Sequence, residues 1–216
     1  MAKGFKKFFR KQTPVVHPGE QLKLRSTPIT WGIPFDEVMF SKFMIFFEKH
    51  ADKMPWDDFV SSEGTIVQKA RNNIHRHFLE DTKSGHLMML DSDIIFPPKM
   101  VETLLAHNLP IVGGWYKDKK AEDHHPAVYD FNYEDEQGVL HWKHRETPGK
   151  GLEKVDGMGA GCWLMHREVA EKLGKEPYNM HAGGEDLVLS RKLATLGIPL
   201  YVDWDINCAH IGVGFY

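Results

Sequence analysis

The stretch HLMMLDSDIIFPPKM, residues 86–100, contains the boundary on which the predicted fold depends. Its apolar run from Leu87 to Leu90 fits a fully buried β-strand. Two carboxylates, Asp91 and Asp93, follow one residue apart, and the chain then returns at once to apolar residues. In open α/β sheets the ligand binds outside the carboxyl ends of the strands, so this position favours a functional site.

Two carboxylates this close repel each other unless protons or a cation neutralise them. Hard oxygen ligands suit Mg²⁺ or Mn²⁺, which keep coordination positions free for phosphate oxygens. Asp91 and Asp93 therefore predict half of a metal–diphosphate site. The alternative is a solvated turn in which an aspartate caps the helix entered through Pro97.

Short apolar runs alternate with helix-length amphipathic segments along the chain. Helices are predicted from about Asp36, after residue 61, from Pro97, from about Glu168 and from Gly184. Such alternation indicates an α/β fold with a mainly parallel sheet and helices on both faces. The predicted strands are 29–33, 59–61, 86–90, 109–116 and 162–166, with extended pieces around 200–204 and 206–210.

The alternation breaks between Lys117 and Lys154, where acidic, histidine-rich and turn-forming residues predominate. Two short β-like pieces, 127–133 and 139–143, lie in this segment. We expect them to form a small hairpin inserted at the edge of the sheet.

The chain has 216 residues, of which 42% are hydrophobic, enough for one sizeable domain over residues 29–216. Residues 1–28 read as a basic N-terminal arm, because seven basic residues face one acidic residue there. The arm's net charge is +6, so a total of -3 leaves -9 for the remainder. The near-neutral total excludes a globally basic nucleic-acid binder.

Cys162 and Cys208 are the only cysteines, which provides neither a disulfide framework nor a four-cysteine zinc site. A reducing, cytoplasmic setting fits this usage best. The sequence shows no signal-peptide pattern and no run of 18 apolar residues, so we expect no transmembrane segment and at most peripheral docking on a membrane.

Two further groups of residues are candidates for chemistry. Glu185 and Asp186 open a predicted helix, although acidic residues in a first turn are also favoured by the helix dipole alone. His210, near the chain end, could ligate a metal through a neutral imidazole, or could be structural. His124, His125, His141 and His144 lie in the inserted segment without a strong ligand spacing, which disfavours zinc.

The glycine-rich run from Val155 to Gly161 superficially matches a dinucleotide-binding fingerprint. The residues that follow it read as a strand, not as the helix that such a fingerprint requires. A loop that a ligand approaches closely is the better interpretation.

Taken together and in this order, these segments resemble a GT-A glycosyltransferase of family 2 or of the small phage and bacterial type. The resemblance spans roughly residues 29 to 212. The matching features are Ile33-Pro34, Ala70-Arg71-Asn72, Met89-Leu90-Asp91-Ser92-Asp93-Ile94, Ile111-Val112-Gly113-Gly114-Trp115-Tyr116, the glycine loop before Cys162-Trp163-Leu164-Met165, Gly184-Glu185-Asp186 and His210-Ile211-Gly212.

The resemblance implies a metal-dependent, inverting transfer of a sugar from a nucleotide-diphosphate sugar, with UDP favoured, to a hydroxyl. Asp93 would bind Mn²⁺ or Mg²⁺, Asp91 would hold the ribose or a metal water, and His210 would add a ligand. Asp186 would be the general base and Glu185 would orient sugar or acceptor. Pro34, Arg71, Ser92, Trp115, Gly159 and Gly161 would contact the nucleotide sugar.

Two other functions use the same features. A nucleotidyltransferase would also use paired carboxylates and a metal, and a binding module of this fold would hold nucleotide or glycan without turnover. The acceptor could be a glycan, a lipid or a hydroxymethylated DNA base. The aromatics and cations interleaved in residues 4–11 could contact a membrane surface or DNA, or belong to a solvated tail.

Overall fold

A computed structural model describes residues 29–35, 41–51, 58–63, 66–119, 125–179 and 184–212. The basic arm of residues 1–28, Asp36, His124 and Gly183 lie outside these ranges.

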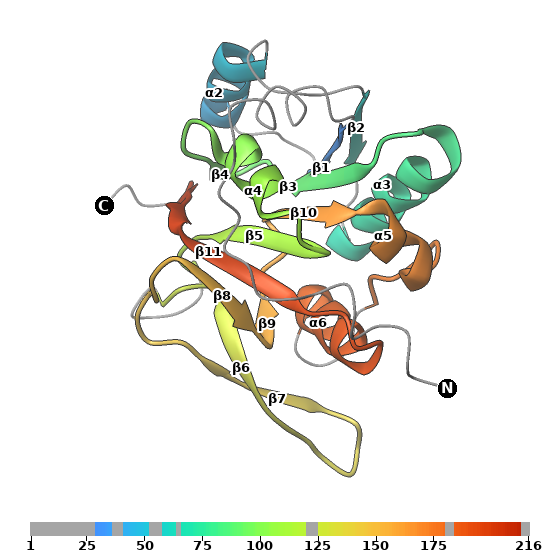
Figure 1. Cartoon of the computed structure of the whole chain (residues 1–216), viewed down its shortest axis with the longest axis vertical. Coiled ribbons are helices and arrows are strands. Elements are labelled where there is room, and N and C mark those ends of the chain that lie inside the picture. Colours follow the sequence, from blue (N-terminus) through green and yellow to red (C-terminus); the bar gives the residue numbers. More distant parts are fainter. Residues whose placement is uncertain are drawn as a thin grey trace.

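A seven-stranded sheet forms the centre of the molecule (Figure 1). Five of its strands run in one direction, whereas β10 and β8 run antiparallel to their neighbours. The predicted mainly parallel sheet is confirmed. In spatial order the strands are β2 (Asp58–Glu63), β1 (Ile29–Phe35), β3 (His86–Leu90), β10 (Cys162–His166), β5 (Ile111–Trp115), β11 (Leu200–Asn207) and β8 (Leu152–Val155).

Helices cover both faces of this sheet, as predicted. The alternation of side chains along β3 shows the two faces: Met88 and Leu90 pack in one hydrophobic cluster, and Leu87 and Met89 in the other. The first cluster includes residues of α2 (Ser41–Ala51) and α4 (Met100–His107). The second includes residues of α3 (Val67–Asp81), α5 (Arg167–Leu173) and α6 (Glu185–Thr195).

The predicted hairpin forms, but its predicted place at the sheet edge is wrong. Its strands, β6 (Val128–Glu134) and β7 (Leu140–His144), join β9 (Gly157–Met158) in a separate three-stranded sheet. In Figure 1 the hairpin projects from the body of the molecule. The edge of the central sheet is β8 instead, a short strand with two apolar residues that the sequence pattern did not reveal.

The end of the chain also differs from the prediction. The pieces expected at 200–204 and 206–210 are largely one strand, β11, whose register against β5 shifts between Asp203 and Asn207. A two-residue strand, β12 (Ala209–His210), then pairs with β4 (Ile94–Ile95). This pairing carries the chain end back to the segment after Asp93. No helix among the described residues is long and apolar enough to cross a membrane.

Candidate functional site

The two aspartates of the opening motif lie just past the end of β3, as the sequence predicted. Their backbone is fixed from two directions. The amide of Asp91 donates to the carbonyl of Gly161 over 2.9 Å, and the carbonyl of Asp93 accepts from the amide of Ile211 over 2.7 Å. The glycine loop and the chain end are thereby tied to the same tripeptide.

Asp93 and His210 form one half of the site. The Nε2 atom of His210 lies 3.3 Å from Oδ2 of Asp93, while its Nδ1 lies 2.8 Å from the carbonyl of Lys117. Since a carbonyl can only accept, Nδ1 carries a proton, and Nε2 is the ring nitrogen that faces the carboxylate of Asp93. Lys119 forms an ion pair with the same carboxylate oxygen.

The charges around Asp93 favour its ionised form. Burial acts to raise its pKa, but the neighbouring His210 and Lys119 outweigh burial and hold the pKa below the ordinary value. Asp93 is therefore a carboxylate at neutral pH, as a metal ligand must be.

The distance between Asp93 and His210 suits a shared divalent cation. Two ligands about 2.1 Å from one metal and roughly at right angles lie about 3 Å apart, close to the separation seen here. Among the described residues, no group of three or more His, Cys, Asp or Glu side chains could hold a metal ion. The pair would thus supply two ligands and leave the rest to water and phosphate oxygens, the usual arrangement for Mg²⁺.

Asp91, Arg71 and Glu185 form the other half of the site. Nη2 of Arg71 donates to both oxygens of Asp91 over 2.8 and 2.9 Å, and its Nη1 pairs with Glu185. Arg71 comes from α3 and is only 3% exposed. Burial opposes its charge, but the carboxylates raise its pKa, so it stays a cation. The expected contact of Arg71 with the donor stays a prediction; in this structure the guanidinium bridges two carboxylates.

Asp186 lies in the first turn of α6, where Gly184 has the positive φ of 93° that favours glycine. Its Oδ1 accepts from the amide of Leu187 over 2.8 Å. Burial raises the pKa of Asp186 from 3.8 to about 6, and Glu185 acts in the same direction against the opposing charge of Arg71. A carboxylate with this pKa is ionised at neutral pH and is a better proton acceptor than an ordinary aspartate.

Tyr116 connects the two halves, and sequence reasoning did not single it out as a site residue. Its hydroxyl oxygen accepts from the amide of Gly161 over 3.0 Å, and its ring lies 5.0 Å from that of His210. Burial, followed by the charges of Asp91 and Asp186, raises its pKa, so the phenol stays protonated. The sequence does contain a signal for Tyr116. Side chains alternate between the two faces along a strand, so Tyr116 and Trp115 point to opposite faces of the sheet, and Tyr116 is the alternative to Trp115 as a site residue.

The glycines of the loop are explained by Tyr116. A Cβ on Gly159 would overlap the tyrosine hydroxyl, and one on Gly161 would lie 2.8 Å from both that hydroxyl and Oδ2 of Asp91. Only glycine fits at such close approaches. Their predicted contact with a ligand is a separate question that stays a prediction.

Ser92, Pro34 and Trp115 are the other residues that were predicted to contact the nucleotide sugar. Ser92 is buried between the two aspartates, and Pro34 is buried near the carboxyl end of β1. Trp115 is not brought together with the carboxylates: it packs against Trp204 in the opposite core and donates to the carbonyl of that residue over 2.9 Å.

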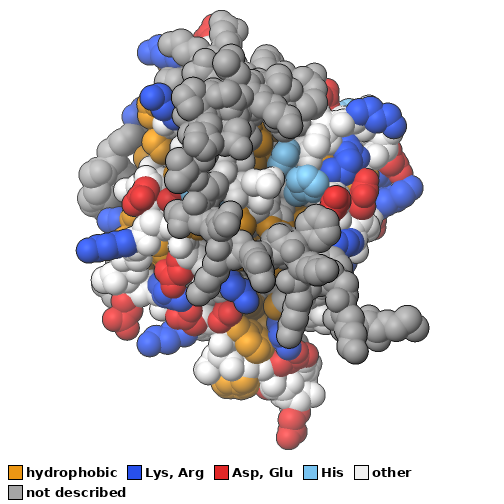
Figure 2. All heavy atoms as spheres, in the orientation of Figure 1, with side chains coloured by type: hydrophobic (Ala, Val, Ile, Leu, Met, Phe, Trp, Pro, Cys, Tyr) orange, Lys and Arg blue, Asp and Glu red, His pale blue; other side chains and the backbone are white. Residues whose placement is uncertain are grey.

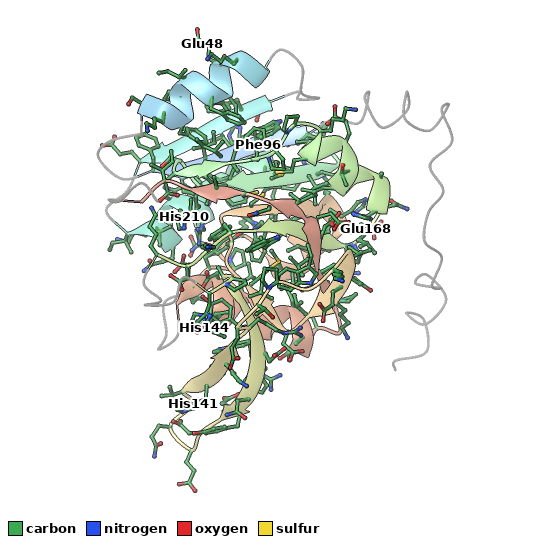
Figure 3. The ribbon with its side chains drawn as sticks, turned by 90° about the vertical axis from the view of Figure 1, so that its left-hand side faces the viewer. Glu48, Phe96, His141, His144, Glu168 and His210 are labelled. Atoms are coloured by element: carbon green, nitrogen blue, oxygen red, sulfur yellow. The ribbon has the colours of Figure 1, made fainter. Side chains whose placement is uncertain are left out.

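Of the histidines in the inserted segment, His141 and His144 lie on the hairpin strand β7. Figure 3 shows His210 on the body of the molecule, with His144 and then His141 further along the projecting hairpin. His141 stacks on Tyr133 and contacts Asp135 over 2.9 Å, whereas His144 packs against Tyr129.

No protein-family model and no curated protein matches the chain. Solved structures do. A197 from STIV superposes with a TM-score of 0.61 at 20% identity, covering 85% of each chain. GalNAc-T7, crystallised with UDP, GalNAc and Mn²⁺, also gives 0.61, at 14% identity over 86% of this chain and 43% of its own. The inositol-1-phosphate CTP transferase from T. maritima reaches 0.47 at 13% identity over 84% and 69%, below the level that supports a common fold.

The chain has a GT-A-like fold, as the resemblance in the sequence predicted. It spans less than half of the GalNAc-T7 chain. At these identities the likeness establishes the fold alone, and the chemistry must be argued from the site.

Proposed function

We propose that this protein is a metal-dependent, inverting glycosyltransferase that moves a sugar from a nucleotide-diphosphate sugar to a hydroxyl. The observation that carries the proposal is the contact of Asp93 with His210 just past β3, together with the partly buried Asp186, whose neighbour Glu185 is joined to Asp91 through Arg71, in a GT-A-like fold. Two ligand atoms 3.3 Å apart and a carboxylate of raised pKa supply a cation site and a base.

Asp93 and His210 would hold Mn²⁺ or Mg²⁺. When bound, this ion supplies Lewis-acid stabilisation of the negative charge on the departing nucleoside diphosphate. The carbonyl of Lys117 fixes the tautomer of His210, which is how the outer contacts of a histidine ligand usually act. GalNAc-T7, which shares the fold, was crystallised with UDP and Mn²⁺, and this favours a UDP-sugar as donor.

Asp186 would act as the base. Its carboxylate takes the proton of the acceptor hydroxyl while the acceptor oxygen forms a bond to the anomeric carbon. The bond from that carbon to the phosphate oxygen breaks, and its electron pair leaves with the diphosphate. A single displacement of this kind inverts the anomeric centre. Arg71 would position Glu185 and Asp91 beside the reacting groups, and both would contact sugar, ribose or acceptor.

Pro34 and Ser92 would contribute to the donor pocket, together with the loop that contains Gly159 and Gly161. Trp115 would act through the packing of β5, because its side chain lies in the opposite core. We place the enzyme in the cytoplasm, with possible contact to a membrane surface or DNA through residues 1–28.

The acceptor would be a glycan, a lipid-linked hydroxyl or a hydroxymethylated DNA base. On the face in Figure 2 the described side chains of both charge signs intermingle. A continuous basic stripe of the kind that follows a DNA backbone is therefore not formed by the described residues of that face. Contact with DNA through that face would depend on the arm.

The test begins with nucleotide-sugar hydrolysis by the purified protein in Mn²⁺, which needs no acceptor. We expect release of nucleoside diphosphate that stops in excess chelator and in Asp93→Ala, with the circular dichroism spectrum unchanged. Asp205→Ala, an exposed carboxylate on β11, is the matched control and should retain activity. Release of pyrophosphate would instead identify a nucleotidyltransferase, and binding of UDP without turnover of any donor or acceptor would identify a binding module.

A further inference from the structure

Lys119 is the feature of the site that the proposed mechanism leaves unused. Its ammonium pairs with Oδ2 of Asp93, the same oxygen that lies 3.3 Å from Nε2 of His210. The side chain of Lys119 is 34% exposed and that of Asp93 is 21% exposed. A cation of the protein thus sits on the carboxylate that would bind the metal.

We infer that Lys119 holds Asp93 in the donor-free protein and transfers to the donor's diphosphate when the divalent cation binds. The inference rests on the proposed function and concerns the order and coupling of its binding steps.

Lys119 and a bound divalent ion would compete for one oxygen of Asp93. A divalent ion shared by Asp93 and His210 would take the oxygen that Lys119 now contacts. An ammonium group and a divalent ion repel each other strongly at contact distance in a partly buried site. Lys119 must therefore leave Oδ2 when the ion binds.

The side chain of Lys119 can move while the backbone before it stays in place. The backbone before Lys119 is anchored: Lys117 forms a β-bridge with Pro126, and the amide of Asp118 donates to the carbonyl of His125 over 2.8 Å. The lysine side chain, by contrast, is a flexible four-carbon stem with a compact charge at its end. Displacement thus relocates the ammonium group and leaves the strand end in place.

The displaced ammonium group of Lys119 needs a new anionic partner. Arg71, a second cation of the site among the described residues, is buried and bound to Asp91 and Glu185. Lys119, by contrast, is a partly exposed cation that lies against Asp93. The diphosphate of the donor would reach a metal bound there. Lysine binds phosphate as a point charge, so the displaced ammonium has a strong new partner there.

The consequence is reciprocal coupling between metal and donor. The metal must displace Lys119 before it binds, which weakens its affinity in the absence of donor. The released ammonium then strengthens donor binding, and by linkage the donor strengthens metal binding to the same extent.

The experiment measures Mn²⁺ affinity by electron paramagnetic resonance of the free ion, with and without UDP as the probe, for wild type, Lys119→Gln and Lys119→Arg. Without UDP, Lys119→Gln should bind Mn²⁺ about threefold to fivefold more tightly, the usual scale for losing a partly exposed ion pair. With Mn²⁺ present, the same variant should bind UDP about tenfold more weakly. Lys119→Arg should restore much of the UDP affinity.

The opposite signs of these two effects are the signature, because a merely structural lysine would weaken both affinities or neither. Lys143→Gln, which removes an equal charge from an exposed position on β7, should change neither. If Lys119→Gln binds Mn²⁺ no more tightly than wild type does, the inference is wrong while the proposed function stands. If neither wild type nor variant binds Mn²⁺, both are wrong.

Discussion

Replacing Asp186 by Asn should stabilise the protein, because the native carboxylate carries an unfavourable charge in a partly buried position. Burial raises its pKa from 3.8 to about 6, which corresponds to about 3 kcal/mol at 1.36 kcal/mol per unit of pKa. The folded state prefers the protonated acid, so the cost is absent below pH 3.8, grows between pH 3.8 and 6 and is constant above pH 6. An amide, which never ionises, avoids that cost.

Urea unfolding of wild type and Asp186→Asn at pH 7.5 and at pH 4 measures this effect. At pH 7.5 the variant should have the larger free energy of unfolding, by up to about 3 kcal/mol, and at pH 4 the difference should nearly vanish. Asp205→Asn, at an exposed position, should shift stability by less than about 0.5 kcal/mol at either pH. Equal or lower stability of Asp186→Asn at pH 7.5 would refute the argument from burial.

The same variant tests catalysis. Asp186→Asn should lower kcat by on the order of 10²-fold or more while donor binding persists. In the wild type, kcat/KM should fall about tenfold per pH unit below the pKa of about 6, because the base works only when deprotonated. A variant that gains stability and loses turnover would show that the site is maintained at a cost to the fold. Near wild-type kcat would remove Asp186 from the mechanism.

Three further changes have clear expectations. Arg71→Met leaves two carboxylates without their partner and should lower the free energy of unfolding by about 3–5 kcal/mol in urea titrations; a loss under 1 kcal/mol would contradict the bridge. Gly159→Ala, whose Cβ would overlap Tyr116, should lower it by about 1–3 kcal/mol, whereas Gly85→Ala, with open space around the Cβ, should not. Deleting residues 2–12 should reduce binding to anionic vesicles or to duplex DNA across a salt series and thereby identify the acceptor class; unchanged binding and turnover would leave the arm as a tail.

The sequence alone determined the layered fold and the position of Asp91 and Asp93 just past the end of a buried strand. The apolar run of β3 followed by Asp91 and Asp93 is a local pattern, and the burial of a strand and the exposure of its end can be read from such a pattern. The position of Glu185 and Asp186 at the start of a helix was likewise predicted from a local pattern. The strand β8 was not predicted, because an edge strand with only two apolar residues has too weak a local pattern.

Only the tertiary structure decided which charges meet. Periodicity shows that a residue is buried, but not which distant residue lies against it. The pairing of β12 with β4 brings His210 to Asp93, and the antiparallel β10 brings the glycine loop to Asp91. Arg71 bridges two carboxylates, because neutralising buried charge is a condition that the whole fold must satisfy, and its contact with the donor stays a prediction. The position of Lys119 on Asp93 follows from the same condition, and no spacing in the sequence encodes it.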